Sequence, residues 1–336
     1  MEGQTGKELS AVSRQESQRP AQRLGVLYSG FMPELPEVET IARGLNTRVA
    51  GDTIESVWIG SRPQVLKSPA SLIASTIEGK RILGVHRAGK HIVFDLAGEV
   101  SALGSGKKKH AGSVRGKTRR TTSPAAPPGH EGVSAAQWIV HLGMTGRMLV
   151  SEADSEIVKH THLIAKLASG RELRYVDPRT FGKLSVHLDS GAGGFDPGGV
   201  EPLEVSEEKF IGLFRGRKTP IKSALLNQKL LRGVGNIYAD ESLFRAGIRP
   251  RRRASSITRE QFSRLYRAVQ EVLREAIALG GSTISDYVDA GGDEGFFQLQ
   301  HRVYGREGEA CTVCGTRIRR VVLAGRSSHY CQNCQK

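Results

Sequence analysis

The sequence predicts an α+β protein in which a β-sandwich with a leading helix precedes a helical domain and a small zinc finger. Eight short apolar runs, separated by glycines and polar turns, lie between residues 54 and 188, and many short strands are typical of a sandwich or barrel. From Glu207 onward, apolar residues recur at helical spacing. All four cysteines lie within the last 26 residues, in two close pairs.

Composition and charge indicate the class of partner. The 336 residues include 49 Lys and Arg against 34 Asp and Glu, a net charge of +15. Such an excess favours a polyanion such as nucleic acid, although a generally basic surface would give the same number. No apolar run approaches the ~20 residues of a membrane span, and residues 1–31 lack the apolar core of a secretory signal. We therefore expect a cytoplasmic protein with no membrane partner. We also expect a monomer.

Two polar segments are expected to lie outside the folded domains. Residues 1–31 show no periodicity and are interpreted as a disordered or non-native extension. Residues 101–136 contain seven Lys and Arg against one Glu and separate two apolar runs, which predicts a disordered basic loop in a hairpin. The rest divides into a sandwich domain over 32–190, a helical domain over 191–300 and a zinc finger over 301–336.

The sandwich domain is expected to begin with an amphipathic helix. Val38, Ile41, Leu45 and Val49 fall on one helical stripe. Strands are expected at the apolar runs that follow, namely Ile54–Ile59, Ile82–His86, His91–Leu96, Trp138–Leu142, Met148–Val150, His162–Leu167, Leu173–Val176 and Leu184–Leu188.

The helical domain contains a turn of the kind found in DNA-binding proteins. Two helices, Ile221–Leu231 and Ile237–Phe244, flank the glycine-rich turn at 232–236. Two helices that meet at a glycine turn belong to the helix-turn-helix class. A longer helix is expected after Thr258, which forms a capping-box pattern with Gln261, and Gly280 stands where a helix-terminating glycine belongs.

The cysteines follow a metal-binding pattern. They are spaced C-x2-C-x16-C-x2-C, and two such knuckles can complete a tetrahedral zinc site. Two disulfides are the alternative, but nothing in the sequence suggests export. Four protein ligands leave no open position, so we expect one structural Zn²⁺, held by Cys311, Cys314, Cys331 and Cys334.

Six motifs together resemble one known family. Residues 32–40 read MPELPEVET, and HLGMTG (141–146), DPRTFG (177–182), GVGNIYADE (233–241), VYGREGE (303–309) and the four-cysteine finger follow in order. Over residues 32–336 the chain resembles the formamidopyrimidine-DNA glycosylases. The resemblance implies a catalytic sandwich and a helix-two-turn-helix DNA-binding domain. It also implies an enzyme that removes oxidised purines from damaged double-stranded DNA and then cleaves the abasic site by β,δ-elimination.

The resemblance assigns the chemistry to Pro33 and Glu34. A proline amine would attack the anomeric carbon of the sugar and form a Schiff base; an α-amino group with a pKa of ~8 is unprotonated far more often than a lysine with a pKa of ~10.4. Glu34 would protonate the ring oxygen of the sugar as general acid, with support from Glu37. Taken alone, a proline and two acids are ordinary at a helix start.

The nitrogen of Pro33 is a tertiary amide in the sequence as written, because Met32 precedes it. The chemistry needs a free secondary amine. We therefore expect the active protein to begin at Pro33, with residues 1–31 reflecting a start site assigned too far upstream or, as the second choice, a segment removed by proteolysis.

The resemblance also implies residues that fill the hole left by a flipped base. Met144, Arg179 and Phe181 match this trio, and apolar wedges with one guanidinium suit the role. Met144 and Phe181 could instead be core residues, but glycine- and proline-rich neighbours favour exposed loops. The family has a second arginine where this chain has Thr180, so we expect one fewer backbone contact there.

Four more residues are implied to contact DNA near the lesion. Lys90, in a turn between two strands, would reach the active-site phosphates, and Lys222 matches a family lysine near the lesion pocket. Asn236, with the glycine turn, would offer N–H donors at a helix start. Arg326 lies between the two cysteine knuckles and matches the arginine of the family's finger. Lys90 and Arg326 could also be ordinary surface side chains.

Two other functions remain open at this point. An endonuclease VIII-like enzyme would act on oxidised pyrimidines, but Leu35, Val38 and the glycine-rich segment at 291–295, which resembles the loop that covers flipped 8-oxoguanine, favour the purine enzyme. A catalytically silent protein that binds damaged DNA is the second alternative if the Pro33 amine is not exposed.

Overall fold

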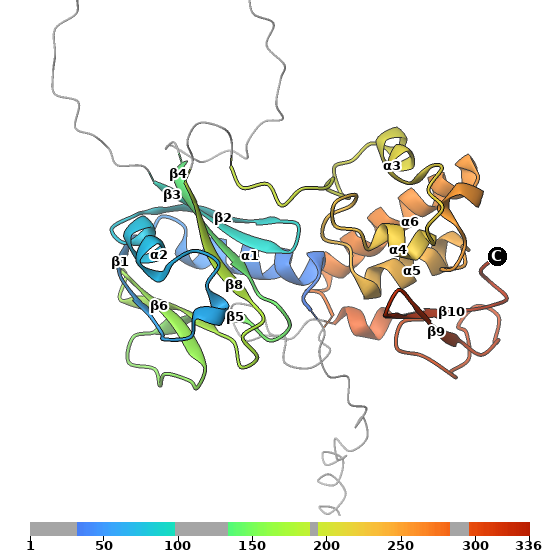
Figure 1. Cartoon of the computed structure of the whole chain (residues 1–336). Helices are drawn as coiled ribbons and strands as arrows, with labels where there is room; N and C mark the ends of the chain where they lie inside the picture. The colour runs from blue at the N-terminus through green and yellow to red at the C-terminus, as the bar shows by residue number, and fades with distance from the viewer. Residues whose placement is uncertain (1–31, 98–133, 189–193, 283–295) are drawn as a thin grey trace, which may run out of the picture.

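The computed structural model describes residues 32–97, 134–188, 194–282 and 296–336 (Figure 1). The expected extension at 1–31, most of the expected basic loop and the glycine-rich segment at 291–295 lie outside these residues. Within the described chain, no helix is long and apolar enough to cross a membrane.

The N-terminal part is the predicted sandwich, made of two four-stranded antiparallel sheets. Short strands with alternating or mostly apolar residues build both sheets, so that one face of each can be buried. The first sheet has the order β1 (Ile54–Ile59), β6 (Thr161–Leu167), β7 (Arg171–Val176) and β5 (Arg147–Glu152), and the second has the order β2 (Ile82–Ala88), β3 (His91–Ala97), β4 (Ser134–His141) and β8 (Lys183–Leu188).

The core of this domain lies between the sheets and under helix α1 (Leu35–Val49), which is the predicted leading helix. The buried rings of Phe94 and Trp138 stack with their centroids 4.7 Å apart. Helix α2 (Ala70–Ile77) was not predicted; it is too short for its three buried residues to give a clear helical stripe. Strand β4 begins at Ser134, so the expected loop at 101–136 extended three residues too far.

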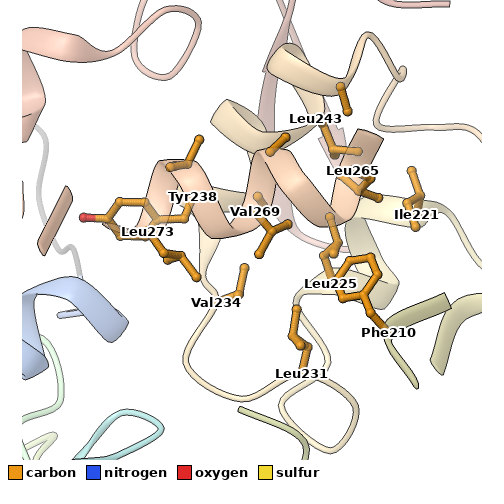
Figure 2. Packing of buried hydrophobic residues seen from close by; sticks show 14 of the residues in the cluster. Phe210, Ile221, Leu225, Leu231, Val234, Tyr238, Leu243, Leu265, Val269 and Leu273 are labelled. Atoms are coloured by element: carbon orange, nitrogen blue, oxygen red, sulfur yellow. The ribbon is translucent and has the colours of Figure 1, made fainter. Parts of the chain in front are cut away.

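The C-terminal part contains helices α3 (Glu207–Phe214), α4 (Ile221–Leu225), α5 (Asn236–Ala246) and α6 (Arg259–Ala278). Figure 2 shows their common core, in which Val269 and Leu273 of α6 lie beside Tyr238 of α5. Thr258 and Gln261 form the predicted capping box of α6. Gly280 follows the C-cap of α6 with a left-handed φ of 75°.

The predicted helix Ile221–Leu231 was too long, since α4 ends at Leu225. The side chain of Asn227 accepts a hydrogen bond from the backbone N–H of Lys229, and its carbonyl accepts from Leu230 and Leu231. An asparagine that bonds its own downstream backbone favours a turn over a helix. The apolar pattern continues through this turn because Leu231 is also buried.

The chain ends in a hairpin of β9 (Arg319–Leu323) and β10 (Arg326–Tyr330), flanked by the cysteine pairs. Glu241 of α5 accepts hydrogen bonds of 2.8–3.0 Å from the backbone N–H groups of Arg302, Val303 and Tyr304. This buried carboxylate fixes the start of the finger region on the helical domain.

The two parts of the chain meet at the start of α1. The backbone N–H of Leu35 donates to the carbonyl of Gly233, in the turn before α5, at 3.0 Å. Nearby, Arg87 of β2 forms an ion pair of 2.8 Å with Glu201, and both side chains are buried. The sandwich and the glycine turn are therefore held together at the place where Pro33 and Glu34 lie.

Candidate functional site

A cavity of about 1000 Å³ opens between the sandwich, the glycine turn and the finger hairpin. Five of the site residues expected from the sequence line it, from three separate parts of the chain: Glu34, Lys90, Met144, Asn236 and Arg326. Its lining also includes Met32, which immediately precedes Pro33. Pro33 itself is half-buried at the start of α1.

The carboxyl group of Glu34 is the buried acid of this cavity. The side chain is 3% exposed, and burial raises the pKa from 4.5 to about 7, against the opposing effect of the nearby Lys90 charge. Oε1 accepts a hydrogen bond of 3.3 Å from the backbone N–H of Ile237, at the start of α5. Oε2 is buried and accepts no hydrogen bond from the described residues.

Glu37 supports Glu34 from one helical turn further along. Its Oε2 accepts a hydrogen bond of 2.8 Å from the backbone N–H of Glu34, which completes a capping box at the start of α1. Its Oε1 accepts from the hydroxyl of Tyr238 and, at 2.8 Å, from the backbone N–H of Ser282. Burial raises the pKa of Glu37 as well. These bonds connect the first turn of α1 to α5 and to the end of α6.

Lys90 reaches the cavity from the β2–β3 hairpin. Gly89 permits the tight turn, with a left-handed φ of 60°. Desolvation lowers the pKa of Lys90, while the charges of Glu34 and Glu37 raise it. The ammonium group therefore lies within electrostatic reach of both acids.

His141, at the end of β4, is a cavity residue that the sequence analysis missed. Its Nδ1 accepts a hydrogen bond of 3.3 Å from the backbone N–H of Gly143, which leaves the proton of the neutral ring on Nε2. Burial, followed by the positive charges of His91 and Lys90, lowers its pKa to about 4. His141 is therefore a neutral donor near pH 7. Its place at the head of the HLGMTG motif was the available signal.

Asp177 organises the two loops that carry Met144, Arg179 and Phe181. Its carboxylate accepts hydrogen bonds from the Thr145 hydroxyl at 2.6 Å and the Arg179 backbone N–H at 3.2 Å. Met144 is half-buried, and Phe181 is 49% exposed, so neither is a core residue. The Arg179 guanidinium lies 4.7 Å from the centre of the Phe181 ring.

Thr180, where the resemblance leads us to expect an arginine, has an unusual backbone. Its φ is 57°, in the left-handed region that favours glycine. Its hydroxyl donates to the carbonyl of Arg179 at 2.7 Å, and its N–H donates to the carbonyl of Asp177 at 3.3 Å. The Thr180 side chain therefore forms its hydrogen bond within the loop itself.

Lys222 does not line the cavity. Its ammonium group lies 2.7 Å from a carboxylate oxygen of Asp240 and donates to the carbonyl of Ser327 at 2.6 Å. Burial lowers the pKa of Lys222, and the charge of Asp240 opposes that shift. In this arrangement Lys222 connects α4, α5 and β10, behind the cavity wall.

Asn236 and Arg326 face the cavity from the helical domain and the finger. Asn236 is the first residue of α5, and its amide group donates to the Ser327 hydroxyl at 3.4 Å. Its side-chain oxygen accepts no hydrogen bond from the described residues. Arg326 is exposed at the first position of β10.

The four cysteines come together as the spacing predicts. Their sulfur atoms all lie within 4.8 Å of one another, with Cys314 and Cys331 at 3.5 Å and Cys311 and Cys334 at 3.9 Å. A tetrahedral Zn²⁺ with Zn–S bonds of ~2.3 Å places its sulfurs about 3.8 Å apart. The four thiols are not paired as disulfides, and this donor set fits one structural zinc with no open position.

Comparisons with known proteins decide the family. The N-terminal domain of formamidopyrimidine-DNA glycosylase matches residues 32–184, its H2TH domain matches 199–288, and the zinc finger found in FPG and IleRS matches 308–336. A formamidopyrimidine-DNA glycosylase of Solibacter usitatus is 41% identical over 307 residues, which cover 91% of this chain and 100% of that protein. The chain belongs to the formamidopyrimidine-DNA glycosylase family.

Solved structures of the family share the fold. The MutM (FPG) protein of Thermus thermophilus is 38% identical with a TM-score of 0.71, over 90% of this chain and 98% of that one. A variant of the Lactococcus lactis FPG, solved with DNA containing Fapy-dG, is 30% identical with a TM-score of 0.74, over 90% of this chain and 100% of that one. These matches confirm the predicted fold class.

Proposed function

We propose that the protein is a base-excision repair glycosylase that removes oxidised purines, such as 8-oxoguanine and formamidopyrimidines, and then cleaves the abasic site. The observation that carries the proposal is a buried carboxyl group beside Pro33, at the wall of a basic cavity. The pKa of Glu34, raised to about 7, keeps a proton available near neutral pH. Lys90 and Arg326 on the same cavity suit the phosphates of DNA.

The reaction uses the amine of Pro33 as nucleophile. Its lone pair forms a bond to C1′ of the damaged nucleotide, and the electrons of the bond between C1′ and the base leave with the base, which takes up the proton that the amine nitrogen loses. Glu34 transfers its proton to the ring oxygen, which opens the sugar and leaves a Schiff base on Pro33. The Schiff base then makes the sugar acidic enough to lose both phosphates in turn. The amine exists only when residues 1–32 are absent.

Four side chains are proposed to hold the phosphates around the damaged nucleotide. Lys90 and Arg326 supply positive charge from the sandwich and the finger, and Asn236 and His141 supply neutral donors. Because the four come from the sandwich, the helical domain and the finger, DNA that binds them all must lie across the cleft between the domains.

Met144, Arg179 and Phe181 are proposed to fill the space left by the flipped nucleotide. The exposure of Phe181 and the loops held by Asp177 support this role. The stacked guanidinium of Arg179 can hydrogen-bond the base that has lost its partner. For Lys222, which was expected near the lesion, we propose an indirect role from behind the cavity, through Ser327.

One structural Zn²⁺ completes the protein, held by the four cysteines, and the residues imply no organic cofactor. We propose that the protein acts as a monomer. We keep the cytoplasm as the expected compartment.

The proposed function is tested by excision from duplexes that each carry one lesion. Protein beginning at Pro33 should release 8-oxoguanine and formamidopyrimidine much faster than thymine glycol. Preference for thymine glycol, an oxidised pyrimidine, would favour the endonuclease VIII-like alternative. Relative rates must be compared, because the Lactococcus lactis FPG has been solved with DNA that contains an oxidised pyrimidine. Binding without excision of any lesion would leave a silent DNA-binding protein and overturn the proposal.

A further inference from the structure

We propose that Asp240 is a positioning residue for DNA binding, because its carboxylate holds the strand that carries Arg326 against helix α5. The inference rests on the proposed function, in which Arg326 contacts a phosphate of the DNA. Asp240 lies in the second turn of α5 with a fully buried side chain, and it does not line the cavity. Any effect of Asp240 on DNA must therefore pass through other residues.

The Asp240 carboxylate joins two elements of the fold. One oxygen forms an ion pair of 2.7 Å with the ammonium group of Lys222, in α4. The other accepts a hydrogen bond of 2.8 Å from the backbone N–H of His329, in β10. Lys222 donates its own hydrogen bond to the carbonyl of Ser327. Both connections end on β10, within three residues of Arg326.

Burial makes these connections stiff. Lys222 is 1% exposed and Asp240 is 0% exposed, so water cannot replace either partner. His329 is also buried, and its ring lies edge-on to that of Tyr304, with the centroids 5.0 Å apart. The middle of β10 is thus fixed on the helical domain at several points.

The zinc site alone does not hold the Arg326 end of the hairpin. Cys331 follows the last residue of β10, whereas Arg326 is the first residue of that strand, beside the exposed turn at 324–325. The metal fixes the far end of β10. Asp240 and Lys222 fix the part of the strand nearest to Arg326, and this placement directs its guanidinium to the cavity.

The variant Asp240→Asn separates this role from general packing. Lys222 and His329 contact different oxygens of the carboxylate, and an amide of the same size keeps an acceptor oxygen at only one of these two positions. Ser242→Ala is the matched control, because Ser242 lies two residues further along α5, is buried, and has a hydroxyl without a partner among the described residues.

The test is equilibrium binding of the full chain to a duplex with an uncleavable abasic-site analogue, over a range of salt concentrations. Asp240→Asn should weaken binding roughly tenfold, as one lost contact between a charged donor and a phosphate implies. The slope of log affinity against log salt should fall by about 0.9, the contribution of one phosphate contact. Arg326→Ala should match both changes, and the double variant should be no weaker than Arg326→Ala. Zinc content should stay at one per chain in all variants, and Ser242→Ala should bind like the wild type.

Three results would overturn the inference. The first is wild-type binding by Asp240→Asn. The second is an additional loss when Asp240→Asn is combined with Arg326→Ala, and the third is an unchanged salt slope, since either of these would show a general effect on the fold. These failures leave wild-type excision of 8-oxoguanine intact. A wild-type chain that neither prefers the damaged duplex nor excises the lesion once it begins at Pro33 would overturn the proposed function, and this inference with it.

Discussion

The carboxyl group of Glu34 occupies the space where Gly235 would carry a side chain. A Cβ built on Gly235 would lie 2.1 Å from the carboxyl carbon of Glu34 and 2.3 Å from its Oε1. The proposed general acid of the sandwich domain therefore fits against the glycine turn of the helical domain only because Gly235 has no side chain. The two parts of the site come from residues about 200 positions apart.

Gly235→Ala should abolish efficient excision while the protein still folds. The added methyl group must displace the Glu34 carboxyl group, and loss of a placed general acid costs about 10²–10⁴ in rate. Single-turnover excision of 8-oxoguanine measures the effect. Gly212→Ala is the matched control, because a Cβ at that position meets nothing within 4 Å. An excision rate for Gly235→Ala within a factor of three of wild type would show that the fit is not needed.

Glu34→Gln should be more stable than the wild type above neutral pH. Burial raises the pKa of Glu34 from 4.5 to about 7, so the native state holds the proton more tightly than the unfolded chain. The free energy of unfolding of the wild type should therefore fall, relative to that of the variant, as pH rises from about 4.5 to about 7. Above pH 7 the difference should level off at about 3 kcal/mol.

Urea unfolding of both proteins at several pH values measures this difference. At pH 4.5 the two should be nearly equal, because the protonated acid and the amide are both neutral. A constant difference from pH 4.5 to 8 would mean that Glu34 does not titrate with a raised pKa in the folded protein.

Phe181→Ala should slow excision from duplex DNA roughly tenfold. The ring is exposed and packs against the Arg179 guanidinium. It is proposed to insert between the stacked bases, and unstacking costs a few kcal/mol per base step. Excision from a duplex and from single-stranded DNA should be compared, since only the duplex must be opened. Leu188→Ala removes another exposed apolar side chain, at the end of β8, and should be neutral. An equal loss on both substrates would argue against a wedge.

Deleting residues 101–133 should weaken binding in low salt without changing the choice of lesion. The segment carries seven Lys and Arg, which can contact phosphates only without regard to sequence. The deletion ends before Ser134, where β4 begins. Binding over a salt series should give a flatter slope of log affinity against log salt. A changed ratio of 8-oxoguanine to formamidopyrimidine excision would show that the segment reaches the pocket.

The sequence predicted the sandwich strands well because each is a short apolar run ended by glycine or polar turns; β1 matches the expected Ile54–Ile59. It failed in the turn after Leu225, where Leu226, Leu230 and Leu231 are at least partly buried and continue the helical spacing of α4 although the chain is no longer helical. The cysteine cluster followed from spacing alone. The strands and the cysteine cluster were predictable because they depend on patterns among residues close together in the sequence.

The site was harder to predict, because its shape depends on long-range contacts. Motifs indicated Glu34 and Lys90, but nothing local shows that Gly235 must lack a side chain for Glu34 to fit. The burial of Lys222 against Asp240 also follows only from the packing of α4 on α5. His141 was missed because a histidine at a strand end is commonplace, and its role emerges only beside the cavity.

The central claim is that the nucleophile is the amine of Pro33, and borohydride trapping on DNA containing 8-oxoguanine tests it most directly. Reduction converts a Schiff base into a stable bond between protein and DNA. Protein that begins at Pro33 should give a covalent adduct, and protein that retains residues 1–32 should give none, because its Pro33 nitrogen is an amide. Robust trapping by the full 336-residue chain, with its N-terminus verified as Met1, would contradict the account and would point to a lysine such as Lys90 as the nucleophile.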